Sequence, residues 1–457
     1  ILTVGSLQIA GKLVTLVHRH LPNGNIDSSF ASNGTFTTSA NYEARGSGID
    51  VRSDAKILIT GYTRHWKNAA WQFDMYTIRL KPNGLLDSSF ATNGVFVSNI
   101  STSSTSFNYG LKILKEQDSS IIIGGYHQPG AGTGYAAFKL KYFGQFDSTF
   151  GNNGYAKFTF APQALPSGFN IQNDGKILIT GRVLNANSDA VTIRVNKKGN
   201  LDSTFGTNGI VTTNLLNHEY GTYVSQLSNG KILVSGAKST DFLLFRLDSV
   251  GNTDNSFGNN GVVIFDNGYY EYPIYHFINP DNSIYLMGRT GLPFGMGTYH
   301  HDYILMNFTG QGKVDSSFAN NGKFIVDFSN YADVPNCSKI QADGKILIAG
   351  SSYDSTNNVF YFNMARIFHS SVGIKEILKN NQDYLSYPNP TSSILNLSYN
   401  LTNIQNSKLE IINSIGQTVL KTEFKNQIDV SQLATGFYTL LLKDNSGSVI
   451  TKKFVKE

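Results

Sequence analysis

Two apolar patterns recur along most of the chain. Seven short apolar strands each end in a glycine, at residues 1–5, 57–61, 121–125, 177–181, 232–236, 284–288 and 346–350. Each is followed by a segment in which apolar and polar residues alternate, such as residues 76–80 or 191–195. A period of two is that of a β-strand with one buried face, so each pair of segments predicts a β-hairpin.

A polar phrase follows six of these hairpins. It reads G-x-x-D-[SN]-[ST]-F-[AG]-x-N-G, and its copies occupy residues 24–34, 84–94, 144–154, 199–209, 251–261 and 312–322. A third strand comes after the phrase, as at residues 34–38, and a fourth precedes the next apolar strand, as at residues 168–171. Four strands in about 58 residues make one blade of a β-propeller. The sequence therefore predicts a seven-bladed all-β propeller over residues 1–368.

The aspartate of the phrase has two explanations. Carboxylates in glycine-rich loops are ligands of calcium, but each loop supplies only one of them. Alternatively, the aspartate accepts backbone N–H groups of its own turn, the phenylalanine fills the space between blades, and Asn-Gly makes a tight turn. We favour the second explanation because it accounts for all three recurring residue types. We therefore expect no metal site and no cofactor, with calcium as the alternative.

These motifs carry a resemblance. The phrase D-S-S-F-x-x-N-G and the strand D-G-K-I-L-I-x-G, at a step near sixty residues, resemble the delta-60 repeat family of bacterial surface proteins. The resemblance covers residues 1–368 and implies the fold and a surface context. Because Ile1 falls in the middle of a repeat, we expect a processed or truncated first blade, with a secretory signal upstream. A closed ring would then need another strand to cover the edge of its last blade.

Length variation points to one rim of the propeller. From the apolar-strand glycine to the aspartate of the next phrase the distance ranges from 18 to 27 residues, while the rest of the repeat is nearly constant. Since variable loops on a fixed scaffold carry function, we expect ligand binding there. The candidate residues are Tyr62, His65, Trp66, Trp71, Tyr126, His127, Tyr299 and His300. Such side chains suit stacking on sugar rings or docking of a protein, unless the two tryptophans fold back onto the blade.

Composition and motifs exclude several classes of protein. A net charge of +5 over 457 residues is too dilute for nucleic-acid binding, and no apolar run approaches the length of a membrane helix. The single cysteine, Cys337, excludes internal disulfides, and we expect it to pack. No P-loop, Rossmann fingerprint, H-E-x-x-H or G-x-S-x-G is present, so we predict no catalytic residue.

The last part of the chain lacks the repeats and has a different pattern of apolar and polar residues. Residues 369–383 form a charged linker with some helical character, and residues 384–457 alternate as a small immunoglobulin-like β-sandwich. This segment resembles the type A C-terminal sorting domain of the type IX secretion system, on landmarks that include Pro388, Asn389, Pro390, Gly416, Gly436 and Tyr438. The resemblance implies that the outer-membrane translocon of a Bacteroidota bacterium reads the domain and that a surface protease removes it. An accessory module without a sorting role is the alternative.

Taken together, these patterns indicate a secreted or cell-surface propeller. We expect it to bind or adhere to an extracellular glycan or protein through its variable rim, without a membrane span and without nucleic acid. An exported enzyme acting on polysaccharide and a purely structural surface component are the alternatives. Clustered carboxylates on the rim would favour the enzyme, whereas exposed tryptophans would favour the binding module.

Overall fold

A computed structural model presents the chain as two compact units, Ile1–His369 and Ser370–Glu457, and each is described here by itself. All regular elements among its described residues are β-strands. The description leaves out residues 10, 40–42, 68–69, 101–105, 116–119, 130–132, 161–162, 185–186, 216–217, 292, 295–297, 300, 329–331, 342, 358, 368–383, 388–390, 400–407, 414–416 and 444–448. The predicted linker therefore lies outside the described residues.

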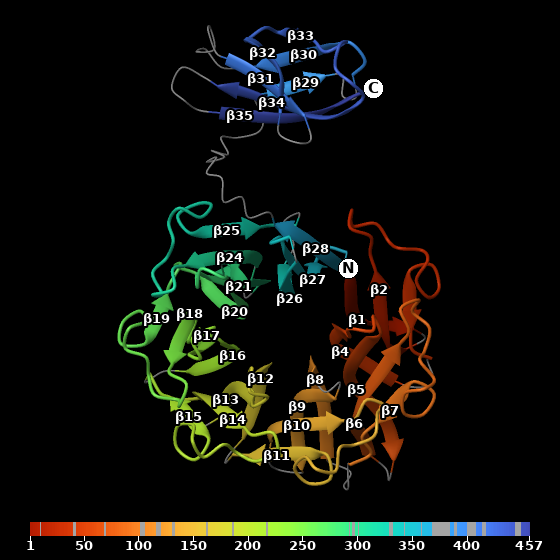
Figure 1. The fold of residues 1–457 in the computed structure, drawn as a ribbon, viewed down its shortest axis with the longest axis vertical. Coiled ribbons are helices and arrows are strands. Elements are labelled where there is room, and N and C mark those ends of the chain that lie inside the picture. Colours follow the sequence, from red (N-terminus) through yellow and green to blue (C-terminus); the bar gives the residue numbers. More distant parts are fainter. Residues whose placement is uncertain are drawn as a thin grey trace. The chain divides into compact units, whose positions relative to one another are not determined.

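The described strands of the first unit form seven blades of antiparallel strands arranged in a ring (Figure 1), as the repeats predicted. The inner strands, nearest the ring axis, are β4 (Glu43–Val51), β8 (Ser106–Lys115), β12 (Ala164–Ile171), β16 (Glu219–Gln226), β20 (Tyr270–Ile278) and β26 (Ala332–Ile340). The second strands are the repeated apolar ones: β1 (Leu2–Ile9), β5 (Ile57–Lys67), β9 (Ile121–Pro129), β13 (Ile177–Val183), β17 (Ile232–Lys238), β21 (Ile284–Gly291) and β27 (Ile346–Asp354).

The alternating segments form the third strand of each sheet. They are β2 (Lys12–Arg19), β6 (Ala70–Leu80), β10 (Gly134–Leu140), β14 (Asp189–Val195), β18 (Asp241–Leu247), β24 (Asp302–Phe308) and β28 (Val359–Ile367). The outer strands are short: β3 (Thr35–Thr37), β7 (Val95–Val97), β11 (Tyr155–Thr159), β15 (Ile210–Thr213), β19 (Val262–Phe265) and β25 (Lys323–Val326). A small hairpin, β22 (Pro293–Phe294) and β23 (Thr298–Tyr299), lies between β21 and β24.

The first and last blades each have three described strands. Blade 1 consists of β1, β2 and β3, and blade 7 of β26, β27 and β28. The two blades are neighbours, because the rings of His20 in blade 1 and Phe362 in blade 7 stack with centroids 6.3 Å apart. Blades 2 and 3 are further joined at one point, where Phe73 of β6 pairs with Phe107 of β8.

In blades 2 to 7 the glycine that ends the apolar strand has a packing role. Opposite Gly61 the register of β4 shifts between Gly46 and Gly48, which brings the inner backbone close to the second strand. A Cβ on Gly61 would lie 1.9 Å from the carbonyl oxygen of Arg45. At the same position in blades 3 to 7 an added Cβ would lie 2.0–2.4 Å from a carbonyl oxygen, and the glycines there are Gly125, Gly181, Gly236, Gly288 and Gly350. Only glycine fits beside this bulge.

The polar phrase folds as the turn explanation predicted. Asn93 and Gly94 have φ of 52° and 91°, the left-handed values of a tight turn. Phe90 is fully buried and packs with Ile121, Ile123 and other residues of the next blade. Its counterparts in blades 1, 3, 4 and 5, which are Phe30, Phe150, Phe205 and Phe257, are also buried. The phrase therefore joins neighbouring blades through apolar contact.

The second unit is a sandwich of two sheets. One has the order β29 (Tyr384–Tyr387), β30 (Ile394–Tyr399), β33 (Gln427–Asp429), and the other β32 (Thr418–Glu423), β31 (Lys408–Asn413), β34 (Gly436–Lys443), β35 (Val449–Lys456). Their inner faces share a core that includes the fully buried residues Leu395, Leu409 and Leu440. The predicted β-sandwich is present.

Candidate functional site

Each blade presents two kinds of connection on opposite rims. On one rim lie the D-G-K turns and the polar phrases, and on the other the second strand turns into the third. The outer strand also ends on this second rim, because β19 runs antiparallel to β18 with Phe265 opposite Phe242. We call it the variable rim, since its loops differ most in length. The candidate residues that the structure describes lie toward this rim.

The phrase aspartates, on the opposite rim, are engaged by protein groups. Asp87 Oδ2 accepts hydrogen bonds from Arg79 Nε at 2.7 Å and lies 2.9 Å from Lys56 Nζ, while Oδ1 accepts from Ser89 Oγ at 2.7 Å. Burial alone would raise the pKa of Asp87, but the bonds from Lys56 and Ser89 and the charge of Arg79 outweigh it and lower the pKa. The pKa of Asp202 is lowered in the same way.

Sequence reasoning missed the cation that pairs with each phrase aspartate. It stands eight residues earlier, on the third strand, in five of the six repeats: Arg19, Arg79, Lys139, Arg194 and Arg246. The arginines also donate to a carbonyl oxygen of the next blade, as Arg79 Nη1 does to Tyr142 at 2.5 Å. The spacing of eight was visible in the sequence, but strand alternation alone does not show which residues form pairs.

The two tryptophans lie at the tip of the β5–β6 hairpin on the variable rim. Trp66 pairs with Trp71 across the hairpin, and their rings meet edge to face with centroids 5.3 Å apart. Trp66 is 61% exposed and Trp71 41%. The guanidinium of Arg64 lies 4.4 Å from the Trp71 ring centroid, and Arg64 Nη2 donates to Glu43 Oε1 at 2.5 Å. Exposed aromatic rings are thus held in place by a cation and an ion pair.

A second aromatic group lies beneath this tip, between blades 2 and 3. Its five half-buried rings are Tyr62, Phe73, Phe107, Tyr109 and Tyr126. Tyr62 and Tyr109 meet edge to face at 4.5 Å, and Tyr109 lies 5.4 Å from Tyr126. Burial, with the electrostatic influence of Tyr62 and Tyr126, raises the pKa of Tyr109 to about 12, so this phenol stays protonated at neutral pH. We call these residues the rim aromatic cluster.

The candidate histidines fare differently. His127 is only 3% exposed, and its Nδ1 lies 2.6 Å from Asn108 Oδ1. Burial, together with the charge of Lys157, lowers the pKa of His127 to about 4. His127 is therefore a neutral interior residue, and we leave it out of the binding surface. His300 lies outside the described residues, and for His65 and Tyr299 only the strand position is described.

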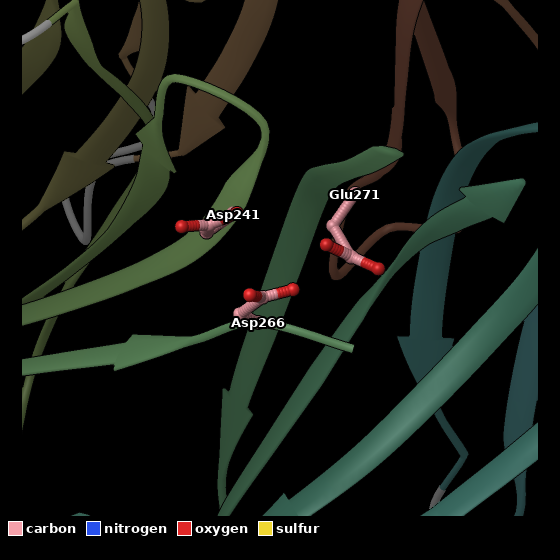
Figure 2. Close-up of side chains that lie close together, drawn as sticks. All are labelled: Asp241, Asp266 and Glu271. Carbon is pink, nitrogen blue, oxygen red and sulfur yellow. The ribbon is translucent and has the colours of Figure 1, made fainter. Parts of the chain in front are cut away.

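Carboxylates gather on the variable rim between blades 5 and 6 (Figure 2). Oxygens of Asp241, Asp266 and Glu271 all lie within 4.8 Å of one another. Asp241 begins β18, Asp266 follows β19, and Glu271 lies near the start of β20 in the next blade. The N–H of Glu271 donates to the carbonyl of Thr240 at 2.8 Å, which draws the two blades together here. Burial, with the charges of Asp241 and Asp266, raises the pKa of Glu271 to about 7.

The same three register positions recur at other junctions. The residues there are Asp74, Asn99 and Asn108 between blades 2 and 3, Asp189, Asn214 and Glu219 between blades 4 and 5, and Asp302, Asp327 and Asp333 between blades 6 and 7. The last set is also clustered within 4.8 Å. The carboxylates come from three distant stretches of sequence, so alternation within one strand could not reveal them.

Two remaining predictions concern single residues. Cys337, which we expected to pack, is exposed on the inner strand β26, so that prediction is wrong. In the second unit, Tyr438 is buried and its hydroxyl donates to the carbonyl of Ala434 at 2.7 Å, while Gly436 begins β34. Pro388, Asn389, Pro390 and Gly416 lie outside the described residues. The role of these landmarks in sorting stays a prediction.

Comparison with protein families gives two matches. Residues 386–457 match the family described as "Secretion system C-terminal sorting domain". Residues 52–90, 172–205, 227–257 and 341–368 match the family described as "Domain of unknown function (DUF5122) beta-propeller". In the described part of the chain no helix has the length and hydropathy needed to cross a bilayer.

Comparison with individual proteins gives weak likenesses to solved structures. No curated protein matches the chain. A solved structure of a protein of unknown function from Dyadobacter fermentans is 9% identical, with a TM-score of 0.35 over 65% of this chain and 84% of that one. An exo-1,5-alpha-L-arabinanase from a bovine ruminal metagenomic library is 9% identical, with a TM-score of 0.30 over 62% and 98%. Hydrazine synthase from Kuenenia stuttgartiensis is 11% identical, with a TM-score of 0.37 over 88% and 67%.

Proposed function

Because the chain is a repeat β-propeller with a sorting domain that directs it through type IX secretion to the cell surface or the medium, we propose that it is a binding and adhesion module. Its ligand is an extracellular glycan or protein, and the contact surface is the tip of the β5–β6 hairpin. A Bacteroidota origin, and removal of the sorting domain by a surface protease, belong to the same proposal.

The observation that carries this proposal is the exposure of Trp66 and Trp71. An indole that leaves 61% of its surface in water forgoes the burial that normally stabilises a large aromatic side chain. The pair is nevertheless ordered, because Trp66 packs edge to face on Trp71 and Arg64 stacks on Trp71. Rings that are exposed and already positioned lose little conformational entropy when a sugar ring or an apolar side chain stacks on them.

The rim aromatic cluster supports the tip from below. Phe73, on the same strand as Trp71, packs on Phe107 of the next blade at 4.8 Å, and Tyr62 packs on Tyr109. These contacts fix the base of a long hairpin to blade 3. A rigid base is what a binding hairpin needs, since a loose one would have to be ordered by the ligand.

Binding by the full-length chain to a glycan array and to whole cells tests this proposal. We expect the double variant Trp66→Ala, Trp71→Ala to lose binding while its melting temperature stays near that of the wild type. Phe143→Ala is the matched control, because Phe143 is 54% exposed but lies beside the polar phrase on the opposite rim. Binding that survives in the double variant, or is lost equally in Phe143→Ala, would remove the hairpin tip from the proposal.

The clustered carboxylates favour a second candidate, an exported enzyme acting on polysaccharide. A carboxyl with a pKa near 7, as at Glu271, can carry the proton that a general acid donates in glycoside hydrolysis. Glu271 is, however, only 3% exposed, and a general acid has to reach the glycosidic oxygen. Release of reducing ends from polysaccharides, abolished by Glu271→Gln, would establish this alternative in place of binding alone.

A further inference from the structure

Three carboxylates converge between blades 5 and 6 without a cation from the protein. Within the described part of the chain, no lysine or arginine forms an ion pair with Asp241, Asp266 or Glu271. The phrase aspartates of the same molecule show the contrast, since Asp254 is paired with both Lys231 and Arg246. Carboxylates at this distance repel one another, so a bound cation would stabilise the cluster.

Glu271 supplies an independent observation. Its Oε1 accepts a long hydrogen bond of 3.3 Å from Thr290 Oγ1, while Oε2 is buried and has no hydrogen-bond partner. Glu271 is only 3% exposed to solvent. A buried carboxylate oxygen without a donor costs free energy unless something else binds it. Figure 2 shows this carboxylate directed at the space it shares with Asp266 and Asp241.

The geometry and donor chemistry point to one kind of ligand. Oxygens at 2.3–2.6 Å on opposite sides of a calcium ion are about 5 Å apart, so three oxygens within 4.8 Å can share one ion. The set contains oxygen donors and no histidine or cysteine, which suits a hard cation. We propose that Asp241, Asp266 and Glu271 bind a divalent cation of the calcium class at the junction of blades 5 and 6.

The burial gradient of the three residues fits a site that a hydrated ion can enter. Asp266 is exposed, Asp241 is half-buried and Glu271 is buried. The ion would enter from the rim, exchange water for Asp266 and Asp241, and satisfy the inner oxygen of Glu271. Because Asp241 and Asp266 belong to blade 5 and Glu271 to blade 6, the bound ion links two blades.

The neighbouring cluster shows why this junction is singled out. At the same register between blades 6 and 7, Asp333 takes the place of Glu271, and both of its oxygens are engaged. The N–H of Phe328 donates to Oδ2 at 2.7 Å, and the hydroxyl of Ser352 donates to Oδ1. The shorter side chain is satisfied by the protein, so that cluster carries no proposal and serves as an internal comparison.

The test uses the full-length chain, stripped of metal with a chelator and dialysed. Titration with terbium, followed by luminescence sensitised by the nearby Tyr270 and Tyr272, counts the sites, and calorimetry with calcium measures affinity. We expect a dissociation constant of about 10⁻⁴–10⁻³ M, as in extracellular modules, and a melting temperature that rises with calcium.

Asp266→Asn is the decisive variant, because Asp266 is exposed and an asparagine oxygen can still accept the hydrogen bond from the N–H of Gly268, so we expect the metal-free fold to persist. We expect this variant to bind one ion fewer than the wild type and to lose the calcium-dependent rise in melting temperature. Asp327→Asn, at the equivalent exposed position of the next junction, is the matched control and keeps the site. An unchanged stoichiometry in Asp266→Asn, or no binding by the wild type, overturns the proposal.

A gain-of-function variant provides a second test in case Asp266→Asn perturbs the structure of the rim. The junction between blades 4 and 5 holds Asp189 and Glu219 but has Asn214 where blade 5 has Asp266. Asn214→Asp completes the three carboxylates, and we expect it to add one terbium equivalent to the wild-type count. These readouts are independent of glycan or cell binding, so the metal site and the proposed binding function can fail separately.

Discussion

Arg366, in the last blade, donates from Nη1 to the carbonyl oxygen of Pro22 in the first blade at 2.6 Å. The same contact joins blade 1 to blade 2, where Arg19 Nη1 lies 2.6 Å from the carbonyl of Pro82, and blade 4 to blade 5, where Arg194 Nη1 lies 2.5 Å from that of Ser249. Blades 7 and 1 therefore meet as sequential blades do. The ring is closed by its own repeat contact, across 344 residues of sequence.

Arg366→Ala should weaken this closure. We expect the propeller to lose about 1 kcal/mol of unfolding free energy, the value of one hydrogen bond to a charged group at a partly exposed site. Urea unfolding monitored by tryptophan fluorescence measures the change. Lys345→Ala is the control, because the ion pair of Lys345 with Asp343 lies within one exposed turn, so its loss should change stability little. Equal effects of the two variants would show that Arg366 does not close the ring.

Asp202→Asn should be far more damaging than substitution of a surface aspartate. Asp202 lies 2.7 Å from Arg194 and 3.0 Å from Lys176, and both its side chain and that of Arg194 are nearly buried. Removing the carboxylate leaves a buried guanidinium uncompensated, so we expect a loss of about 3 kcal/mol. Asp343→Asn, at an exposed turn, should cost less than about 0.5 kcal/mol. Similar denaturation midpoints for the two variants would contradict the claim that the phrase aspartate stabilises the fold through a buried ion pair.

The same carboxylates predict how stability depends on pH. The pKa values of Asp87, Asp202 and Asp254 are lowered in the folded state, so their contribution is fully present above the unfolded value near 4. It is lost as the pH falls below 4 toward the folded values, because the unfolded chain then binds more protons. In a series of measurements from pH 6 to pH 2, the melting temperature should decrease once the pH is below about 4. In Asp202→Asn the melting temperature should decrease less steeply with falling pH. An unchanged slope would argue against a contribution of Asp202 to this pH dependence.

Gly61→Ala should destabilise the propeller by roughly 1–3 kcal/mol, because the new Cβ would meet the carbonyl oxygen of Arg45. Gly5 holds the same position in blade 1, where a Cβ would find nothing within 4 Å. We therefore expect Gly5→Ala to alter stability by no more than about 0.5 kcal/mol in this chain. Thermal unfolding of the two variants side by side measures the difference. A large loss in Gly5→Ala would mean that a strand does lie beside β1.

The residues of the polar phrase were predictable because their contacts are local. Asp87 and Ser89, or Asn93 and Gly94, are near neighbours whose turn chemistry does not depend on the rest of the molecule. Period-two alternation likewise predicted the hairpins, and their repetition predicted seven blades. Exposure of Trp66 and Trp71 was left open, since alternation cannot say whether a loop folds back onto its blade.

The sequence by itself determined the repeat, the blade count, the turn chemistry and the C-terminal β-sandwich, because each depends on residues close together in the chain. Only the tertiary structure decided which residues meet between blades. Arg366 and Pro22, or Asp241 and Glu271, come together because a ring places the end of one blade against the start of the next. It also decided that His127 is interior and that Cys337 is exposed. Such contacts depend on inter-blade packing, which leaves no periodic signal in either strand.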